Sequence, residues 1–114
     1  MIRHTILFNV KPDVTTQEIE EALTAMQDLG NKLQGIFAIH TGECKFHDEK
    51  SRLFFSYKMH MGVSHIVSID FMDENALENF FQNPVMQPAK NAIVRIALNG
   101  YNGIVGFDLE NKEI

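Results

Sequence analysis

Imidazole is the group in this sequence best suited to proton transfer, and two of the five histidines lie in strongly apolar segments. His4 stands among alternating apolar residues near the N-terminus, and His65 stands in a similar segment in the second half of the chain. An imidazole with an ordinary pKa of about 6.5 serves as a general base near neutral pH. His4 is therefore the first candidate catalytic residue and His65 the second. The competing hypothesis is that each is a pocket or core histidine satisfied by a carbonyl or hydroxyl group.

A further hypothesis is that His4 and His65 act together as a pair. Both share the phase of the apolar residues around them, so pairing of their strands would bring them to one face of a sheet. Two neighbouring rings would share a proton or hold a metal ion. The spacing alone does not diagnose such a pair, because the contact joins distant parts of the chain.

Soft metal ligands gather in one stretch of the sequence and just before it: Cys44, His47, Tyr57, Met59, His60 and Met61. Thioether and imidazole ligands suit Cu(I). However, strand alternation sends Met59 and Met61 to the face opposite His60, and no Cys-x-x-Cys pair is present. We therefore predict no metal site and no cofactor, with Cys44 as a buried inert thiol.

Composition and charge exclude several classes of protein. The 114 residues include 45% hydrophobic residues, which is enough for one globular domain over 1–114. The formal charge is −5 and the cations are scattered, so neither nucleic acid nor an anionic membrane surface is an expected partner. No stretch approaches the ~18 apolar residues of a membrane-spanning helix. A single cysteine and no apolar leader favour a cytoplasmic location.

Alternating and helical patterns define the elements that would position these side chains. Strands are expected over residues 2–10, 36–46, 53–61, 63–71 and 101–109. The 53–61 and 63–71 segments read as one long or broken strand. A capping box formed by Thr15 and Glu18 opens a helix over 15–33. A second helix starts at Asp73 and stops at Asn83–Pro84, and a short third one follows Pro88.

The resulting order is β-α-β-β-α-(α)-β, the ferredoxin-like α+β pattern. Helices cover one face of the sheet. The opposite face also carries apolar residues, to which we assign Leu7, Ile39 and Ile66. An apolar second face must be covered, and a second copy of the chain is the simplest cover. The pattern therefore predicts a homodimer in which two sheets meet face to face.

These segments resemble the stress-responsive A/B barrel family of the dimeric α+β barrel superfamily. The resemblance is carried by residues 2–8 with Lys11-Pro12, by 64–71, by 77–84 and by Phe107-Asp108. It implies a ferredoxin-like protomer that forms a dimeric α/β barrel, with a pocket between the sheet and the helices of each protomer. The segment 46–62 is longer than expected for this family.

One plant member of the family is a polyketide cyclase with a catalytic tyrosine and histidine. By resemblance, its tyrosine falls on Phe80, its catalytic histidine on Met86 and a further pocket histidine on His4. Phenylalanine and methionine transfer no protons, so the cyclase mechanism is not carried over. The apolar pocket positions expected to contact a ligand are Ile6, Phe8, Val67, Ile69, Leu77, Phe80, Phe81 and Met86.

Two functions are compatible with these residues, and the sequence does not decide whether the protein is an enzyme. In the first, the dimer binds a small hydrophobic or aromatic molecule in the apolar pocket, with cofactor-independent acid/base chemistry at His4. Proton abstraction next to a carbonyl group is the reaction class, by analogy with other members of the superfamily. In the second, the dimer is a non-enzymatic, stress-associated structural or assembly protein whose pocket is filled by its own side chains.

Overall fold

The computed structural model describes residues 1–44 and 63–110 of the chain. Four strands and three α-helices, with short 3-10 helices between them, make up these residues. In chain order they are β1 (Ile2–Phe8), α1 (Thr16–Asp28), η1 (Leu29–Asn31), β2 (Ile36–Glu43), β3 (His65–Phe71), α3 (Glu74–Gln82), η3 (Pro84–Met86), α4 (Gln87–Ile96), η4 (Gly100–Gly103) and β4 (Val105–Glu110).

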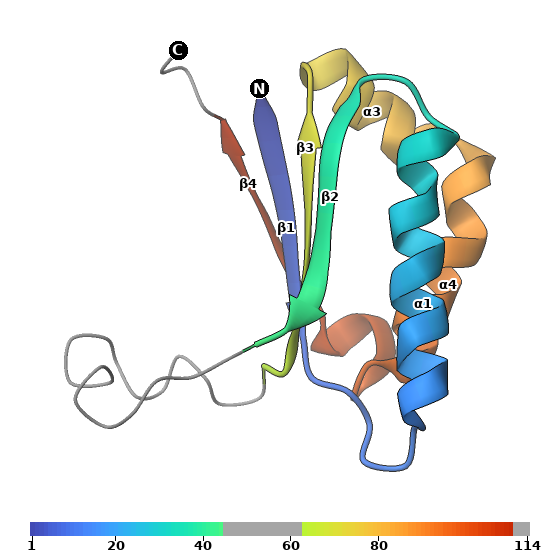
Figure 1. Ribbon diagram of the computed structural model, residues 1–114. Helices are drawn as coiled ribbons and strands as arrows, with labels where there is room; N and C mark the ends of the chain where they lie inside the picture. The colour runs from blue at the N-terminus through green and yellow to red at the C-terminus, as the bar shows by residue number, and fades with distance from the viewer. Residues whose placement is uncertain (45–62, 111–114) are drawn as a thin grey trace, which may run out of the picture.

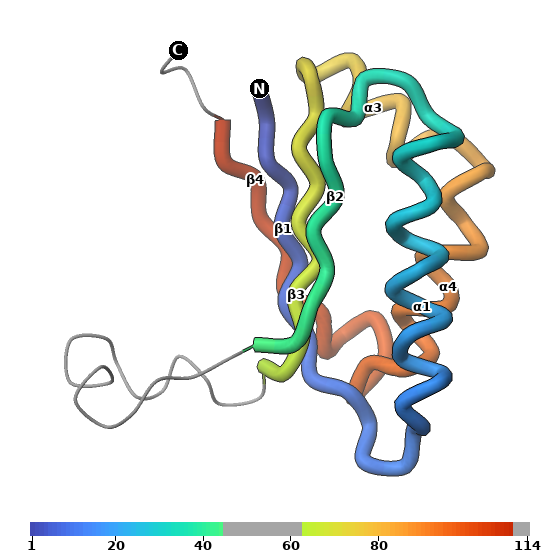
Figure 2. Tube along the Cα trace, viewed as in Figure 1, coloured from blue at the N-terminus to red at the C-terminus, as the bar shows by residue number. Residues whose placement is uncertain are grey.

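The strands form one antiparallel sheet in the order β2-β3-β1-β4. The helices cover one face of this sheet (Figure 1), and α1 and α4 contact each other and run side by side along it (Figure 2). The predicted ferredoxin-like βαββαβ order is therefore confirmed. Since β1 lies between β3 and β4, every second side chain of β1 points from the sheet toward the helices, between the side chains of its two neighbouring strands.

Local sequence signals set the helix boundaries. Thr15 accepts a hydrogen bond from the Glu18 amide at 3.1 Å, and the Glu18 carboxylate accepts one from the Thr15 amide, so the predicted capping box is present. Asp73 caps α3 by accepting from the Ala76 amide at 2.9 Å. Asn83 ends α3 with an extended backbone before Pro84. α1 stops at Asp28, earlier than predicted, because the chain tightens into η1.

One close approach fixes the join between α3 and the sheet. Gly35 has φ +84°, and a Cβ there would lie 2.6 Å from the Cβ of Ala76. Only glycine meets both conditions, a left-handed backbone and contact with a helix. The Gly35 carbonyl also accepts a hydrogen bond from the Met72 amide at 2.7 Å, which holds the start of β2 beside the end of β3.

The hydrophobic core lies between the helices and the sheet. Its fully buried large side chains are Phe8, Leu29, Val67, Ile69, Phe71 and Ile93. Ile39 pairs with Ile69 across β2 and β3 and packs against this core. The assignment of Ile39 to the opposite face was therefore wrong, because a register shift between Ile36 and Ala38 changes the alternation of β2.

The opposite face of the sheet carries three rows of side chains across β3, β1 and β4. Leu7 pairs with Ile66 on one side and with Val105 on the other, as predicted for an apolar second face. In the described residues this face is not covered: Val105, Phe107 and Leu109 are 60%, 51% and 60% exposed. These three β4 side chains, together with Leu7 and Ile66, form the outer apolar face.

One ion pair lies on the same side of the sheet. The guanidinium of Arg3 donates two hydrogen bonds to the Asp70 carboxylate, at 2.6 and 3.0 Å. These bonds lower the pKa of Asp70 below its ordinary value, against the opposing effect of burial, and raise the pKa of Arg3. The pair satisfies a carboxylate that is only 6% exposed.

Several sequence predictions fall on other residues or differ in their limits. The 53–61 strand and the ligands His47, Tyr57, Met59, His60 and Met61 lie outside the described residues. The last strand begins at Val105, because residues 100–103 form η4. Within residues 1–44 and 63–110, none of the helices has the length and hydropathy needed to cross a membrane.

Candidate functional site

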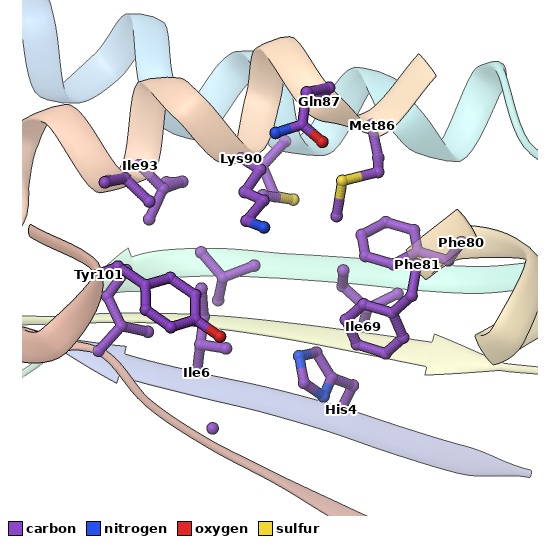
Figure 3. Close-up of a pocket in the computed structure, with 15 residues that line it drawn as sticks. His4, Ile6, Ile69, Phe80, Phe81, Met86, Gln87, Lys90, Ile93 and Tyr101 are labelled. Atoms are coloured by element: carbon purple, nitrogen blue, oxygen red, sulfur yellow. The ribbon is translucent and has the colours of Figure 1, made fainter. Parts of the chain in front are cut away.

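A cavity of about 290 Å³ lies between the sheet and the helices α3 and α4 (Figure 3). This volume is just below the range for small-molecule sites, about 300–1,000 Å³. The cavity is lined by His4, Ile6, Met26, Val67, Ile69, Phe80, Phe81, Met86, Gln87, Lys90, Ile93, Val94, Tyr101, Ile104 and Gly106. Most of these side chains are apolar, and the few polar ones therefore decide what chemistry the cavity supports.

His4 is the titratable group on the sheet side of the cavity. Its ring stands off β1 toward the cavity (Figure 3), and its side chain is 16% exposed. Nδ1 lies 2.6 Å from a carboxylate oxygen of Asp108, its register partner on β4. A carboxylate only accepts hydrogen bonds, so Nδ1 carries the proton and Nε2 of the neutral ring keeps its lone pair. The pair thus fixes the tautomer that a general base needs.

The space around His4 is kept open on one side and closed by aromatic rings on the other. Gly106 on β4 has no side chain, and a Cβ there would lie 3.7 Å from Cε1 of His4. Phe81 meets the His4 ring edge-on at 5.1 Å, and Phe80 meets Phe81 in the same way at 5.4 Å. These contacts hold the imidazole between an open edge and an apolar wall.

The helix side of the cavity contributes three polar side chains that the sequence patterns did not single out: Gln87, Lys90 and Tyr101. The Lys90 ammonium lies 5.5 Å from the centroid of the Tyr101 ring, within the range of a cation–π contact. Tyr101 belongs to η4, which begins after Asn99 in the left-handed conformation, φ 65°. The signal for Lys90 was present in the sequence, since it falls one turn from both Met86 and Ile93.

His65 lies at the other end of the same sheet face and does not line the cavity. It is 7% exposed, its ring stacks on Phe8 at 5.9 Å, and its Nδ1 lies 2.8 Å from the Ser64 hydroxyl. Burial lowers its pKa below the ordinary value, although Glu43 opposes this shift. The structure gives His65 the setting of a core histidine.

The strand register does not bring the two histidines together. His4 pairs with Ile69, whereas His65 pairs with Phe8. Four residues of strand separate the two positions, which corresponds to about 13 Å. The hypothesis of a shared proton or shared metal at His4 and His65 is wrong for this reason.

Six of the eight predicted pocket positions line the cavity: Ile6, Val67, Ile69, Phe80, Phe81 and Met86. Phe8 is buried against His65 instead, and Leu77 packs beside the core. The apolar lining residues outside these eight positions are Met26, Ile93, Val94 and Ile104, with Gly106 on β4. Phe80 and Met86 are 3% and 6% exposed, so the positions that resemble the cyclase pair are occupied by buried apolar side chains.

Metal ligation has no support in the described part of the chain. There, no group of three or more His, Cys, Asp or Glu side chains lies close enough to hold an ion. Cys44 is half-buried, and burial raises its thiol pKa, with a further contribution from Glu43. A higher pKa leaves less of the nucleophilic thiolate at neutral pH, and the inert role of Cys44 stays a prediction.

Comparison with known proteins places the fold. No curated protein matches the chain. Among solved structures, a protein from Arabidopsis thaliana shares 18% identity with a TM-score of 0.79, covering 100% of this chain and 98% of its own. A dimeric ferredoxin-like protein of unknown function from Jannaschia shares 23% identity with a TM-score of 0.76, covering 96% and 98%.

A third similar structure is the hydroxynitrile lyase from Passiflora edulis, with 15% identity, a TM-score of 0.77 and coverage of 99% of this chain and 95% of its own. At these identities the likeness shows the fold alone. The family model of the stress responsive A/B barrel domain, often abbreviated Dabb, matches residues 2–111. Because this match spans nearly the whole sequence, the chain belongs to the stress responsive A/B barrel domain family.

Proposed function

We propose that the protein binds a small hydrophobic or aromatic molecule in the 290 Å³ cavity and transfers a proton at His4 without a cofactor. The observation that carries this proposal is the 2.6 Å contact between His4 and Asp108 at the edge of an apolar cavity. A histidine that only fills space needs no carboxylate to orient it. A general base does, because the carboxylate fixes the tautomer and stabilises the imidazolium formed during reaction.

Proton abstraction next to a carbonyl group is the reaction that these side chains fit. Nε2 of His4 would take the proton from the carbon, the electron pair of that C–H bond would form a carbon–carbon double bond, and the π pair of the carbonyl group would move onto its oxygen. Lys90 and the hydroxyl of Tyr101 are cavity groups able to stabilise the resulting enolate. Return of the proton to carbon or oxygen would complete the cycle. That one structural neighbour is named as a lyase supports an enzymatic use of the fold.

The competing function is a structural protein whose pocket is filled by its own side chains. The lack of a phenol at Phe80 and of an imidazole at Met86 favours it. The unfilled volume beside His4 favours the binding function instead, since cores pack to few voids larger than a water molecule. The cytoplasmic location predicted from the single cysteine stays a prediction under either function.

We also propose that the chain forms a homodimer through the outer apolar face. Its three exposed β4 side chains, Val105, Phe107 and Leu109, lie together on one strand. Structural neighbours from Jannaschia and Thermobifida fusca are described as dimeric ferredoxin-like proteins. Phe107→Glu should convert the dimer to a monomer in light scattering, because it places an unpaired charge in the interface. A wild-type monomer at micromolar concentration would contradict the homodimer.

Deuterium incorporation tests the proposed chemistry. Phenylacetone and phenylpyruvate are incubated with the protein in D₂O, and loss of the proton signal next to the carbonyl is followed by NMR. The wild type should accelerate exchange of at least one probe, and His4→Gln should reduce that acceleration by about 10²- to 10⁴-fold. Exchange that is equally fast in His4→Gln with an unchanged melting temperature would refute a catalytic role for His4.

A further inference from the structure

Lys90 occupies an inward-facing position on α4. Its neighbours one turn away on the same face, Met86 and Ile93, are 6% and 2% exposed, and all three line the cavity. A helix that contacts a core presents apolar residues at this spacing. A lysine in that stripe gives up part of the hydration that a solvent-facing lysine keeps, and this loss must be offset by an interaction.

In the part of the chain that the structure describes, no carboxylate lines the cavity to offset this loss. The lining includes Lys90 but neither aspartate nor glutamate. In residues 1–44 and 63–110, the ion pairs are Arg3–Asp70 and His4–Asp108, and Lys90 takes part in neither. The centroid of the Tyr101 ring lies 5.5 Å from the Lys90 ammonium. The ring attracts the cation weakly, but it is not an anionic hydrogen-bond acceptor.

The two ends of the cavity differ in the polar groups that they hold. Phe80, Phe81 and Met86 lie together at one end, whereas Lys90 and Tyr101 lie toward the other, near Ile6 and Ile93 (Figure 3). Lys90 and His4 face the cavity from opposite sides, from α4 and β1 (Figure 3). A molecule that matches this arrangement has a compact apolar body at one end and a negatively charged group at the other.

We infer that the cavity selects small organic monoanions, that is, carboxylic acids with a compact aromatic or branched body. The carboxylate accepts charge-assisted hydrogen bonds from Lys90 and from the hydroxyl of Tyr101. The body contacts the apolar end, and the carbon chain passes His4. This inference rests on the proposed binding function, since it takes the cavity to be a ligand site, and it does not require that His4 perform chemistry.

Matched acid and amide probes test the inference, because the two differ in charge and hardly in shape. Affinities are measured by calorimetry for 4-ethylbenzoate against 4-ethylbenzamide and for 4-methylpentanoate against 4-methylpentanamide. In the wild type, the acid of at least one pair should bind about 10- to 100-fold more tightly than its amide. Lys90→Met should abolish this preference, and Lys90→Arg, which keeps the charge, should retain most of it.

Two control variants separate this inference from the proposed chemistry. Lys32→Met removes an exposed cation outside the cavity and should leave the acid preference intact. His4→Gln should keep the acid preference while it loses deuterium exchange. Equal affinity for acids and amides, or a preference that survives in Lys90→Met, would overturn the acid selectivity alone. Failure of every probe to bind at millimolar concentration would overturn the binding function as well.

Discussion

The two ends of the helix-facing sheet surface each hold a histidine, and they differ in what surrounds it. At one end, His65 is 7% exposed, stacks on Phe8 and lies 2.8 Å from the hydroxyl of its neighbour Ser64. At the other end, His4 lines a cavity and is oriented by a carboxylate on the next strand. Both rings come from the same face of the same sheet. The covering elements, and not the strand pattern, therefore make one histidine structural and leave the other available.

The contrast follows from how the ends are closed. Around His65, two hydrogen bonds hold the neighbouring backbone in place. The Val10 amide donates to the Ser64 hydroxyl at 3.1 Å, and the Ser64 amide donates to the Phe8 carbonyl at 2.9 Å. Around His4, Gly106 leaves β4 without a side chain, and Phe81 is 50% exposed. A packed, hydrogen-bonded end favours stability, whereas an open end leaves volume for a ligand.

The largest expected effect separates the two histidines by stability. His65→Ala should lower the free energy of unfolding by about 2–4 kcal/mol, since it leaves a void against Phe8 and removes the Ser64 contact. His4→Ala, which enlarges an existing cavity, should cost about 1 kcal/mol or less. Urea denaturation at one fixed protein concentration measures both, because a dimer's stability depends on concentration. Equal losses would break the distinction between the two ends.

A smaller effect concerns the carboxylate that orients His4. Asp108→Asn should slow deuterium exchange by about 10- to 100-fold, because an amide can donate to Nδ1 and reverse the tautomer. Stability should hardly change, since the Asp108 side chain is 48% exposed. Asp13→Asn, at an exposed position that does not line the cavity, is the matched control. Full exchange activity in Asp108→Asn would show that the pair does not prepare a base.

The smallest expected effect is a dependence of folding stability on pH that arises from His65. Burial lowers the pKa of His65 in the folded state, so between this pKa and the ordinary value of about 6.5 the unfolded chain binds more protons. Stability should therefore fall as the pH decreases below about 6.5, and His65→Gln should flatten that slope. Thermal melts between pH 7.5 and about 5.5 measure it. An identical slope in His65→Gln would contradict the assigned burial effect.

Sequence patterns predicted the fold well because its determinants are local. The capping box at Thr15, the cap at Asp73 and the stop at Asn83–Pro84 each depend on residues within one helical turn. Alternation placed His4 and Ile6 on one face of β1 correctly. The register shift at Ile36/Ala38 was not visible in the sequence, so Ile39 was assigned to the wrong face.

The candidate site was harder to predict because it is assembled across elements. The partner of His4 is Asp108, which is 104 residues away and was noticed only through the family resemblance. Lys90 was counted among scattered cations, although its helical spacing from Met86 and Ile93 marks an inward position. Phe8 and Phe81 are the same residue type, and both have apolar neighbours in the sequence. Their contacts in the folded protein differ, since Phe81 meets His4 at the cavity and Phe8 stacks on His65 in the core.

Under the proposed function, the His4 end of the sheet binds small molecules and the His65 end does not. NMR of the histidine ring protons tests it in one sample, with the two signals assigned from His4→Gln and His65→Gln. On titration with 4-ethylbenzoate or 4-ethylbenzamide, the His4 ring signals should shift in a saturable way while those of His65 stay unchanged. Signals of His4 that remain fixed at high probe concentration, or equal shifts at both rings, would rule out a binding site confined to the His4 end.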